Sequence, residues 1–262
     1  MSTESGIPDY RSPGRPPHKP VSYNDIVSSD NVRRRFWARS LFGYPRLSRA
    51  VPNSGHTYLA ELESIGRCAG VVTQNVDGLH QRGGSRSVVE LHGNAHSVTC
   101  IMCGWQERRD IVHATLKAAN RAWLESLPPS GDSVESMPDG DAALSPVSLA
   151  AFELPICEGC GSTMLVPTVV FYGGTVDPAV AAAAAHMVDS SDALVVLGTT
   201  LSTQSALRLV RSAHQRSCPV AIINHGVTRG DPLATVTLDV HASTVLRAWA
   251  TEARASSAYG TR

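Results

Sequence analysis

The sequence lacks both an excess of one charge and any long apolar run. Lysine plus arginine and aspartate plus glutamate each number 23 among 262 residues, so the net charge is zero when histidine is neutral. This balance argues against a nucleic acid or a membrane surface attracted by bulk charge. No run reaches the ~18 apolar residues of a membrane helix, and the N-terminal sequence MSTESGIPDYR has no apolar signal-peptide core. We therefore expect a cytoplasmic protein without nucleic-acid or membrane partners.

Cysteine is also scarce, but its spacing is informative. Four of the six cysteines form two CxxC pairs, Cys100 with Cys103 and Cys157 with Cys160. In a cytosolic chain of this size, paired CxxC turns indicate zinc before a disulfide. A redox dithiol is the alternative. The 53 residues between the pairs exceed the usual ribbon spacing, so we expect an insertion there. Four protein ligands would close the coordination shell, which predicts a structural zinc rather than a catalytic one.

Hydrophobic patterning predicts an α/β fold. The predicted strands are residues 69–73, 88–91, 168–172, 193–197, 220–223 and 235–240. The predicted helices are residues 31–41, 56–65, 110–127, 178–188, 203–215 and 242–254. Strands that alternate with helices predict a doubly wound parallel sheet. Residues 98–165 are expected to form a separate module, and loops are expected at residues 1–20 and between Pro45 and Pro52.

Polar residues follow two of the predicted strands. Gln74, Asn75 and Asp77 follow the first, and His92 follows the second. Ligands of open α/β sheets bind at the carboxyl ends of the strands. Asp77 could accept a hydrogen bond from a carboxamide, and His92 could act as a base near neutral pH. Taken singly, each residue can be explained as a capped strand end, and a structural role explains His92 alone better than a catalytic one.

Two later strands also end on residues suited to a nucleotide. Gly198, Thr199 and Thr200 follow one strand and precede a helix, an arrangement that can bind phosphate or ribose through backbone N–H groups. Asn224 follows the next strand and could bind ribose hydroxyls or only shape a turn. Glycine is common at such turns, so these signals indicate nucleotide binding only in combination.

The motifs together resemble the sirtuin family in order and spacing. They are STESGIPDYR, TQNVDGLH, ELHG, the two CxxC pairs, VVFYGG, LGTTL and INHG. The resemblance covers essentially the whole chain, and the segments PDYRS, FWARSLFGYP and PDGD resemble the class II branch, which includes the lipoamidase type. It implies a Rossmann-like NAD-binding domain formed by residues 1–97 and 166–262, with an inserted small zinc-binding domain at residues 98–165.

The same resemblance implies an NAD-dependent protein-lysine deacylase, which transfers the acyl group to ADP-ribose and releases nicotinamide. It implies NAD and zinc as cofactors and acylated-lysine proteins or peptides as substrates. His92 matches the general base, and the zinc ligands would be Cys100, Cys103, Cys157 and Cys160. The implied cofactor residues are Ile7, Pro8, Asp9, Tyr10, Arg11, Gln74, Asn75, Asp77, Gly198, Thr199, Thr200, Asn224, His225, Gly226 and Ala242. The implied substrate residues are Val169, Val170 and Phe171, to which a peptide would add as a strand.

The sequence departs from the family pattern at its start. The family places a strand that ends in a GAG turn before STESGIPDYR, whereas Met1 stands where the residue after that turn belongs. The first strand and the GAG turn of the sheet are thus missing from this sequence. We expect that the start was assigned too far downstream; the alternative is a truncated chain with unpaired strand edges and fewer phosphate-binding donors.

Several alternatives remain open from the sequence. The first is mono-ADP-ribosyl transfer to protein, which uses the same cofactor and cleavage step. The second is a non-catalytic module that binds NAD or zinc. A nucleic-acid-binding zinc ribbon is the third, and the neutral charge argues against it. The Tyr/Arg pair of desuccinylase-type relatives is not evident, which argues against a strongly acidic acyl group.

Overall fold

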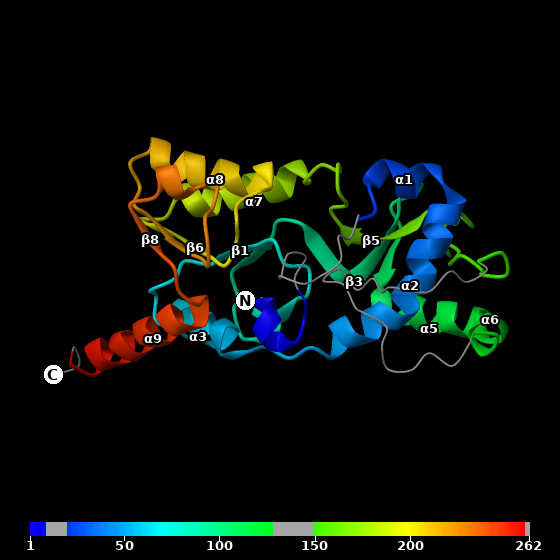
Figure 1. Cartoon of the computed structure of the whole chain (residues 1–262), viewed down its shortest axis with the longest axis horizontal. Helices are drawn as coiled ribbons and strands as arrows, with labels where there is room; N and C mark the ends of the chain where they lie inside the picture. Colours follow the sequence, from blue (N-terminus) through cyan, green and yellow to red (C-terminus); the bar gives the residue numbers. More distant parts are fainter. Residues whose placement is uncertain (9–19, 128–148, 260–262) are drawn as a thin grey trace.

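The structure is a computed structural model that describes residues 1–8, 20–127 and 149–259. Its elements gather into two lobes, and Figure 1 shows α1 and α2 at one end of the molecule with α5 and α6. The bounds of these four helices are Tyr23–Ser28, Asp30–Arg49, Arg109–Ala119 and Arg121–Glu125. None of the helices within the described residues is both long and apolar enough to cross a membrane.

The first lobe contains the parallel strands. The pair β1 (Val71–Thr73) and β2 (Val88–Glu90) is parallel, and so is the three-stranded ladder of β6 (Leu194–Leu197), β7 (Val220–Ile223) and β8 (Val236–Leu238). The strands lie close to their predicted positions, because short runs of apolar residues favour buried parallel strands. Within the described residues, β1 and β6 each have a hydrogen-bonded neighbour on one side only.

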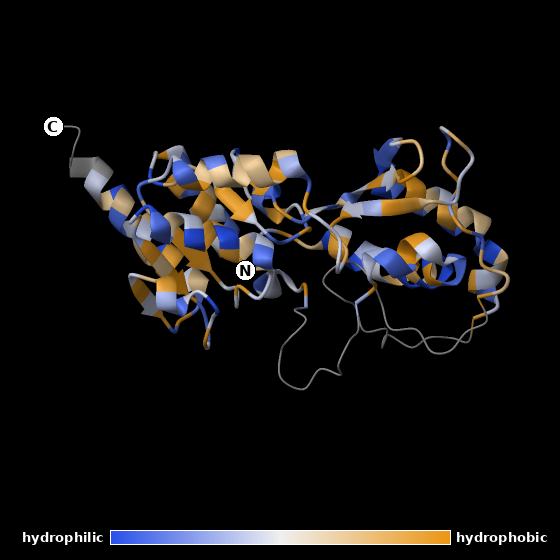
Figure 2. Cartoon of the chain, turned by 90° about the horizontal axis from the view of Figure 1, so that it is seen from above, coloured by the Kyte–Doolittle hydropathy of each residue, from blue (hydrophilic) through white to orange (hydrophobic). Residues whose placement is uncertain are grey.

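Helices cover both faces of these strands, as a doubly wound fold requires. Helices α7 (Pro178–Asp189) and α8 (Gln204–Gln215) lie on one face, and α3 (Ser54–Ser64) and α9 (Ala242–Tyr259) lie together on the other (Figure 1). One core includes residues of α7, α8, β6 and β7, and a second joins α3 and α9 to Val71 and Leu197. Figure 2 shows orange, hydrophobic strands in this lobe and helices that mix orange and blue residues.

The second lobe is built on an antiparallel sheet. Strand β3 (Gly93–Cys100) lies between β4 (Gln106–Arg108) and β5 (Leu165–Val169). Its core combines side chains of α1, α2, α5 and α6 with β3 and β5, including the fully buried Trp37 and Phe152. Strands β3 and β5 extend across the predicted boundaries at residues 97/98 and 165/166, so they connect the two lobes. Those domain boundaries themselves stay a prediction.

Four short elements complete the chain. Three of them are the 3-10 helices η1 (Ser2–Ser5) and η2 (Asp231–Leu233) and the α-helix α4 (Leu79–Arg82). The fourth is α1 (Tyr23–Ser28). The expectation of a loop over residues 1–20 was wrong at its start, because Ser2–Ser5 form η1. The remainder of that stretch, residues 9–19, lies outside the described residues.

Two helix predictions were wrong in extent. Helix α2 continues through Pro45 to Arg49, although proline cannot donate the usual backbone hydrogen bond. Buried Leu41, Tyr44 and Leu47 hold this segment against the core, and their packing outweighs the lost bond. The helix predicted over residues 110–127 is broken at Asn120, whose buried side chain donates to the carbonyls of Leu116 and Glu153.

The strand predicted over residues 168–172 also needs correction. It begins earlier, as β5 (Leu165–Val169), and it pairs antiparallel with β3 rather than joining the parallel sheet. Strand β3 was not predicted, because GNAHSVTC mixes polar and apolar residues without the apolar run used to find the other strands. The N-cap of α3 is Asn53, since the Asn53 side chain accepts from Gly55 N and the His56 ring accepts from Asn53 N.

Candidate functional site

The four paired cysteines meet at one point of the second lobe. The sulfurs of Cys100 and Cys160 lie 3.7 Å apart, those of Cys103 and Cys157 lie 3.6 Å apart, and all four lie within 4.8 Å of one another. Zinc bound tetrahedrally at ~2.3 Å from each sulfur would place the sulfurs ~3.8 Å apart. The donor set therefore fits zinc, and the four cysteines predicted as its ligands lie together.

The ends of β1 and β6 are joined by side chains. The Gln74 amide nitrogen donates to Thr199 Oγ1 at 3.1 Å, and Thr203 Oγ1 donates to Gln74 Oε1 at 3.0 Å. Gly198, between β6 and Thr199, has φ 58°, a left-handed conformation that glycine adopts without strain. The structure thus brings together two groups of polar residues that the sequence placed at separate strand ends.

Asp77 lies under the first residues of the chain. It is 3% exposed; its Oδ1 accepts from Leu79 N at 3.0 Å, and its Oδ2 accepts from the Ser2 hydroxyl at 2.5 Å. The Asn75 amide donates to the same Ser2 hydroxyl at 2.8 Å. A buried carboxylate and an amide therefore share one small polar cluster, which suits recognition of a neutral amide such as nicotinamide.

His92 follows β2 and contacts two parts of the molecule. Its Nε2 lies 2.9 Å from Ser205 Oγ on α8, and its backbone carbonyl accepts from Val170 N at 2.8 Å. Burial lowers the pKa of His92 below its usual 6.5, and a hydrogen bond with the backbone of Gln74 opposes that shift. The neutral ring, the form that can take a proton, therefore persists to lower pH than in a free histidine.

The predicted substrate segment adjoins His92. Val169, the last residue of β5, pairs with Gly93. Val170 lies just beyond the strand, and its N–H donates to the His92 carbonyl. The Phe171 ring meets the Phe36 ring edge to face, with centroids 5.7 Å apart. The segment thus connects the neighbourhood of His92 with α2 of the second lobe.

The remaining predicted cofactor residues divide into two groups. Ile7 is buried against Tyr44 and Leu79, Pro8 is half-buried, and Asp9, Tyr10 and Arg11 lie outside the described residues. The second group follows β7: the Asn224 amide donates to the carbonyls of His225 and Gly226. The exposed His225 ring bonds Asp239, and Thr200 and Ala242 are half-buried.

The start of the chain connects these groups. Ser243, next to Ala242 on α9, donates to Glu4 of η1 at 2.8 Å, and Asn53 donates to the Met1 carbonyl and to Ser5. Sequence reasoning did not single out Ser2, Thr203 or Ser205 as partners of the predicted site. Isolated hydroxyl residues have no distinguishing pattern, and only their distances in space identify them.

Two buried histidines interact electrostatically with Asp77. His56 and His80 are 0% and 4% exposed, and their ring centroids lie 4.8 Å apart. Within the described residues, His56 Nε2 and His80 Nδ1 have no hydrogen-bond partner. Burial lowers the pKa of both rings, with His80 shifted to about 4, and the nearby Asp77 charge opposes the shift. Both rings are therefore neutral at pH 7.

Comparison with known proteins agrees with this geometry. A model of the Sir2 family matches residues 1–205. The NAD-dependent protein deacylase SIR4 of Monosiga brevicollis is 45% identical over 231 residues, which cover 88% of this chain and 74% of that protein. The mitochondrial NAD-dependent protein lipoamidase sirtuin-4 of Bos taurus is 38% identical over 244 residues, or 91% of this chain and 75% of that protein.

Solved structures are similar over the whole fold. A structure described as Sir2 with p53 peptide and NAD+ superposes with a TM-score of 0.71 at 28% identity, covering 96% of this chain and 88% of that one. A structure of Sir2Tm bound to a propionylated peptide has a TM-score of 0.69 at 27% identity, with the same coverage of 96% and 88%. Both similarities extend across the two lobes described above.

Proposed function

The chain belongs to the Sir2 family, and we propose that its NAD-dependent protein-lysine deacylase activity depends on His92 as general base. The substrates are acylated-lysine proteins or peptides, and the cofactors are NAD and a structural zinc. NAD supplies the ADP-ribosyl group that receives the acyl group as nicotinamide is released.

One observation carries this proposal. The His92 ring is half-buried and bonded to Ser205, while its carbonyl accepts from Val170 N in the segment proposed to bind the peptide. A single residue is therefore adjacent both to the strand ends that suit a nucleotide and to the substrate segment. Since the ring is neutral at pH 7, it can remove a proton from a ribose hydroxyl.

The neighbouring residues have complementary roles. Asp77 and Asn75 would hold the nicotinamide carboxamide, because a buried carboxylate accepts from an amide N–H₂ group. Gln74 fixes the turn of Gly198, Thr199 and Thr200, whose backbone would face the phosphates and the adenosine ribose. Asn224, His225, Gly226 and Ala242 would complete the adenosine side, and Ile7 and Pro8 lead into the cofactor loop that includes Asp9, Tyr10 and Arg11.

Acyl-lysine binding follows from the strand next to His92. Val169, Val170 and Phe171 would pair with an extended peptide and place its acyl group beside the ring. Holding the acyl oxygen in line with the ribose carbon is a positioning effect, which can contribute up to roughly 7–11 kcal/mol to catalysis in favourable cases. Because positioning dominates, modest changes around the segment should affect the rate strongly.

The proposed location is the cytoplasm. Cys68 and Cys218 are free thiols outside the zinc site, which suits a reducing compartment. Nucleic acid and membrane are not proposed as partners, since the sequence has no net charge. Fractionation of cells that express a tagged chain would test the location, and recovery in an oxidising compartment would contradict it.

Nicotinamide release tests the proposed roles. We expect release from NAD only when an acylated-lysine peptide is present, and loss of peptide deacylation in His92→Asn. His186→Asn is a matched control, because His186 is exposed on α7, away from the strand ends. Full deacylation by His92→Asn, or equal loss in His186→Asn, would contradict the role of His92.

A further inference from the structure

His96 lies on β3, at an irregularity in the pairing of that strand with β5. Asn94 pairs with Thr168, and Val98 pairs with Pro167, the neighbour of Thr168 on β5. Three residues of β3, His96 among them, therefore stand outside this register. The backbone N–H of His96 donates to the Asn94 side-chain oxygen at 2.7 Å. Irregularities of this kind re-aim side chains and are common beside active sites. The direction of the half-buried His96 ring is therefore set by its own contacts.

The His96 ring contacts the turn that follows β1. Its Nε2 lies 2.9 Å from the Asp77 carbonyl oxygen. A carbonyl oxygen only accepts, so Nε2 carries the hydrogen and donates it. The ring also packs on Gly78, because a Cβ built there would lie 3.4 Å from His96 Cδ2. Gly78 has φ 64°, a left-handed conformation that glycine adopts without strain. His96 thus holds the turn that carries the Asp77 carboxylate.

Tyr44 of α2 contacts the other nitrogen of the same ring. The buried Tyr44 hydroxyl lies 3.4 Å from His96 Nδ1, and the two rings meet edge to face with centroids 5.9 Å apart. In a neutral ring that carries its hydrogen on Nε2, Nδ1 is an acceptor, so the hydroxyl donates to it. Tyr44 therefore favours the tautomer that His96 needs in order to donate to Asp77.

The start of β3 also holds a second carbonyl of this loop. Ala95 N, next to His96, donates to the Val76 carbonyl at 2.9 Å. Two consecutive carbonyls, those of Val76 and Asp77, are therefore bonded to one short stretch of β3. A shift of this backbone would move the buried Asp77 carboxylate. His92 lies four residues before His96, so a single segment carries the proposed base and fixes the proposed nicotinamide ligand.

We infer that His96 is a positioning residue, which holds Asp77 in the place where its carboxylate binds the nicotinamide carboxamide. It acts through the Asp77 backbone. This inference rests on the proposed deacylase function and adds to it a residue that neither the strand pattern nor the family motifs selected. Asp77 is proposed to bind nicotinamide and not the peptide. Loss of the His96 bond should therefore weaken the binding of NAD and of free nicotinamide and leave the peptide site unchanged.

Three substitutions separate the hydrogen bond of His96 from its shape. His96→Phe keeps a ring without nitrogens, His96→Asn has an amide too short to reach the Asp77 carbonyl, and His96→Gln places an amide N–H₂ near the position of Nε2. In His96→Phe and His96→Asn, the KM for NAD and the nicotinamide concentration that halves deacylation should each rise about fivefold, the effect of one hydrogen bond. The KM for the peptide should change less than about twofold, and His96→Gln should recover most of the loss.

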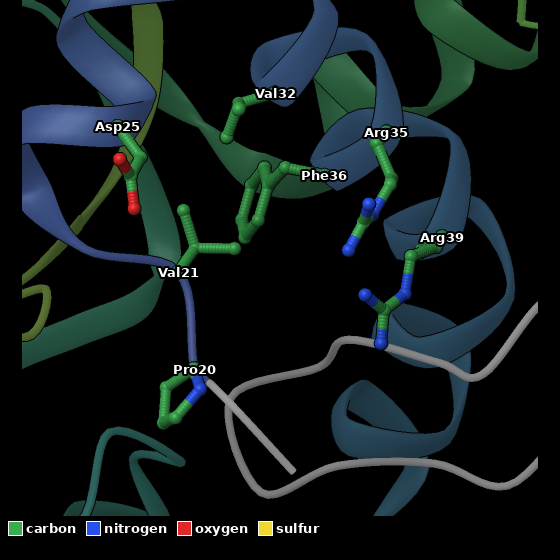
Figure 3. A pocket seen from close by; sticks show the side chains of 7 residues that line it. All are labelled: Pro20, Val21, Asp25, Val32, Arg35, Phe36 and Arg39. Atoms are coloured by element: carbon green, nitrogen blue, oxygen red, sulfur yellow. The ribbon is translucent and has the colours of Figure 1, made fainter.

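Two control variants test for a general disturbance of the fold. Val32 lines a cavity of about 170 Å³ between α1 and α2, together with Val21 and Phe36 (Figure 3). Val32→Ala therefore removes packing from the same lobe as β3. His214→Gln removes an exposed ring whose Nδ1 also bonds a backbone carbonyl, that of Leu233. Both controls should keep the wild-type KM for NAD, and a rise equal to that of His96→Phe in either one would overturn the inference.

Wild-type values in His96→Phe would overturn the inference, and His96→Asn decides in the same way if His96→Phe fails to fold. An equal loss in His96→Gln would assign the effect to the ring alone and would also overturn it. Calorimetry with NAD follows the same contact without turnover, and the Kd should rise about fivefold in His96→Asn.

The outcomes separate the inference from the function on which it rests. If the wild-type chain releases no nicotinamide and deacylates no peptide, the proposed function fails. If it deacylates peptides and the His96 variants match it, the function stands and only the inference fails.

Discussion

His92 Nε2 and Ser205 Oγ lie 2.9 Å apart, which joins the second residue after β2 to the first turn of α8. The hydroxyl therefore fixes the orientation of the ring that we propose as general base. Ser205 is a positioning residue, because it acts through His92.

Ser205→Ala should lower kcat/KM for an acylated peptide about fivefold, since one hydrogen bond contributes ~1 kcal/mol. Ser205→Thr keeps a hydroxyl and should recover part of the loss. NAD binding by calorimetry should change little in either variant. Undiminished kcat/KM in Ser205→Ala would show that the contact does not orient the ring.

The pH dependence of activity should reflect the lowered pKa of His92. The base works when neutral, and a folded-state pKa below 6.5 keeps it neutral further into acid. Loss of kcat/KM on acidification should therefore have its midpoint below pH 6.5. The measurement is a pH–rate profile at subsaturating peptide, and a midpoint above pH 6.5 would contradict the assignment.

Stability should depend on pH through the buried His80. Its pKa is about 4 in the folded chain and 6.5 in the unfolded chain, so below pH 6.5 the unfolded state binds more protons. At pH 5 the free energy of unfolding should be about 2 kcal/mol lower than at a pH above 6.5 because of His80 alone. His56 changes the free energy of unfolding in the same direction.

Denaturant unfolding at pH 7.5 and pH 5 checks this prediction. His80→Gln removes the titrating ring, so the difference in unfolding free energy between the two pH values should be smaller than in the parent chain. His186→Gln, at an exposed site, should keep the parent difference. The same pH dependence in His80→Gln and the parent would show that His80 is not responsible.

Zinc should be bound in a ratio of about one ion per chain, and its removal should destabilise the second lobe. Cys160→Ser should lower both the zinc content and the melting temperature. Cys218→Ser is the matched control, because Cys218 is a free thiol outside the cluster. Elemental analysis with thermal unfolding provides the readout, and full zinc content in Cys160→Ser would refute the four-cysteine site.

Much of the first lobe could be predicted from sequence, because its information is local. Strands ending at Thr73, Glu90, Leu197 and Ile223 are short apolar runs followed by polar residues. The CxxC pairs likewise specify two ligands each within a single turn. Family resemblance then supplied NAD as the cofactor and the reaction, which no single motif established.

The rest depended on contacts between distant residues. The continuation of α2 past Pro45 depends on packing against other elements, and the break at Asn120 depends on a bond to Glu153. The position of Ser205 beside His92 depends on how α8 meets β2. Helix α1, a short segment of six residues, was not predicted at all.

The most direct test of the central claim is the fate of the acyl group. The chain is incubated with NAD and a peptide whose lysine carries an isotope-labelled acyl group, and the products are identified by mass spectrometry. The account predicts free-lysine peptide, nicotinamide and ADP-ribose that carries the label, with none of these formed by His92→Ala. Label retained on the peptide together with ADP-ribose attached to it would instead demonstrate ADP-ribosyl transfer and contradict the account.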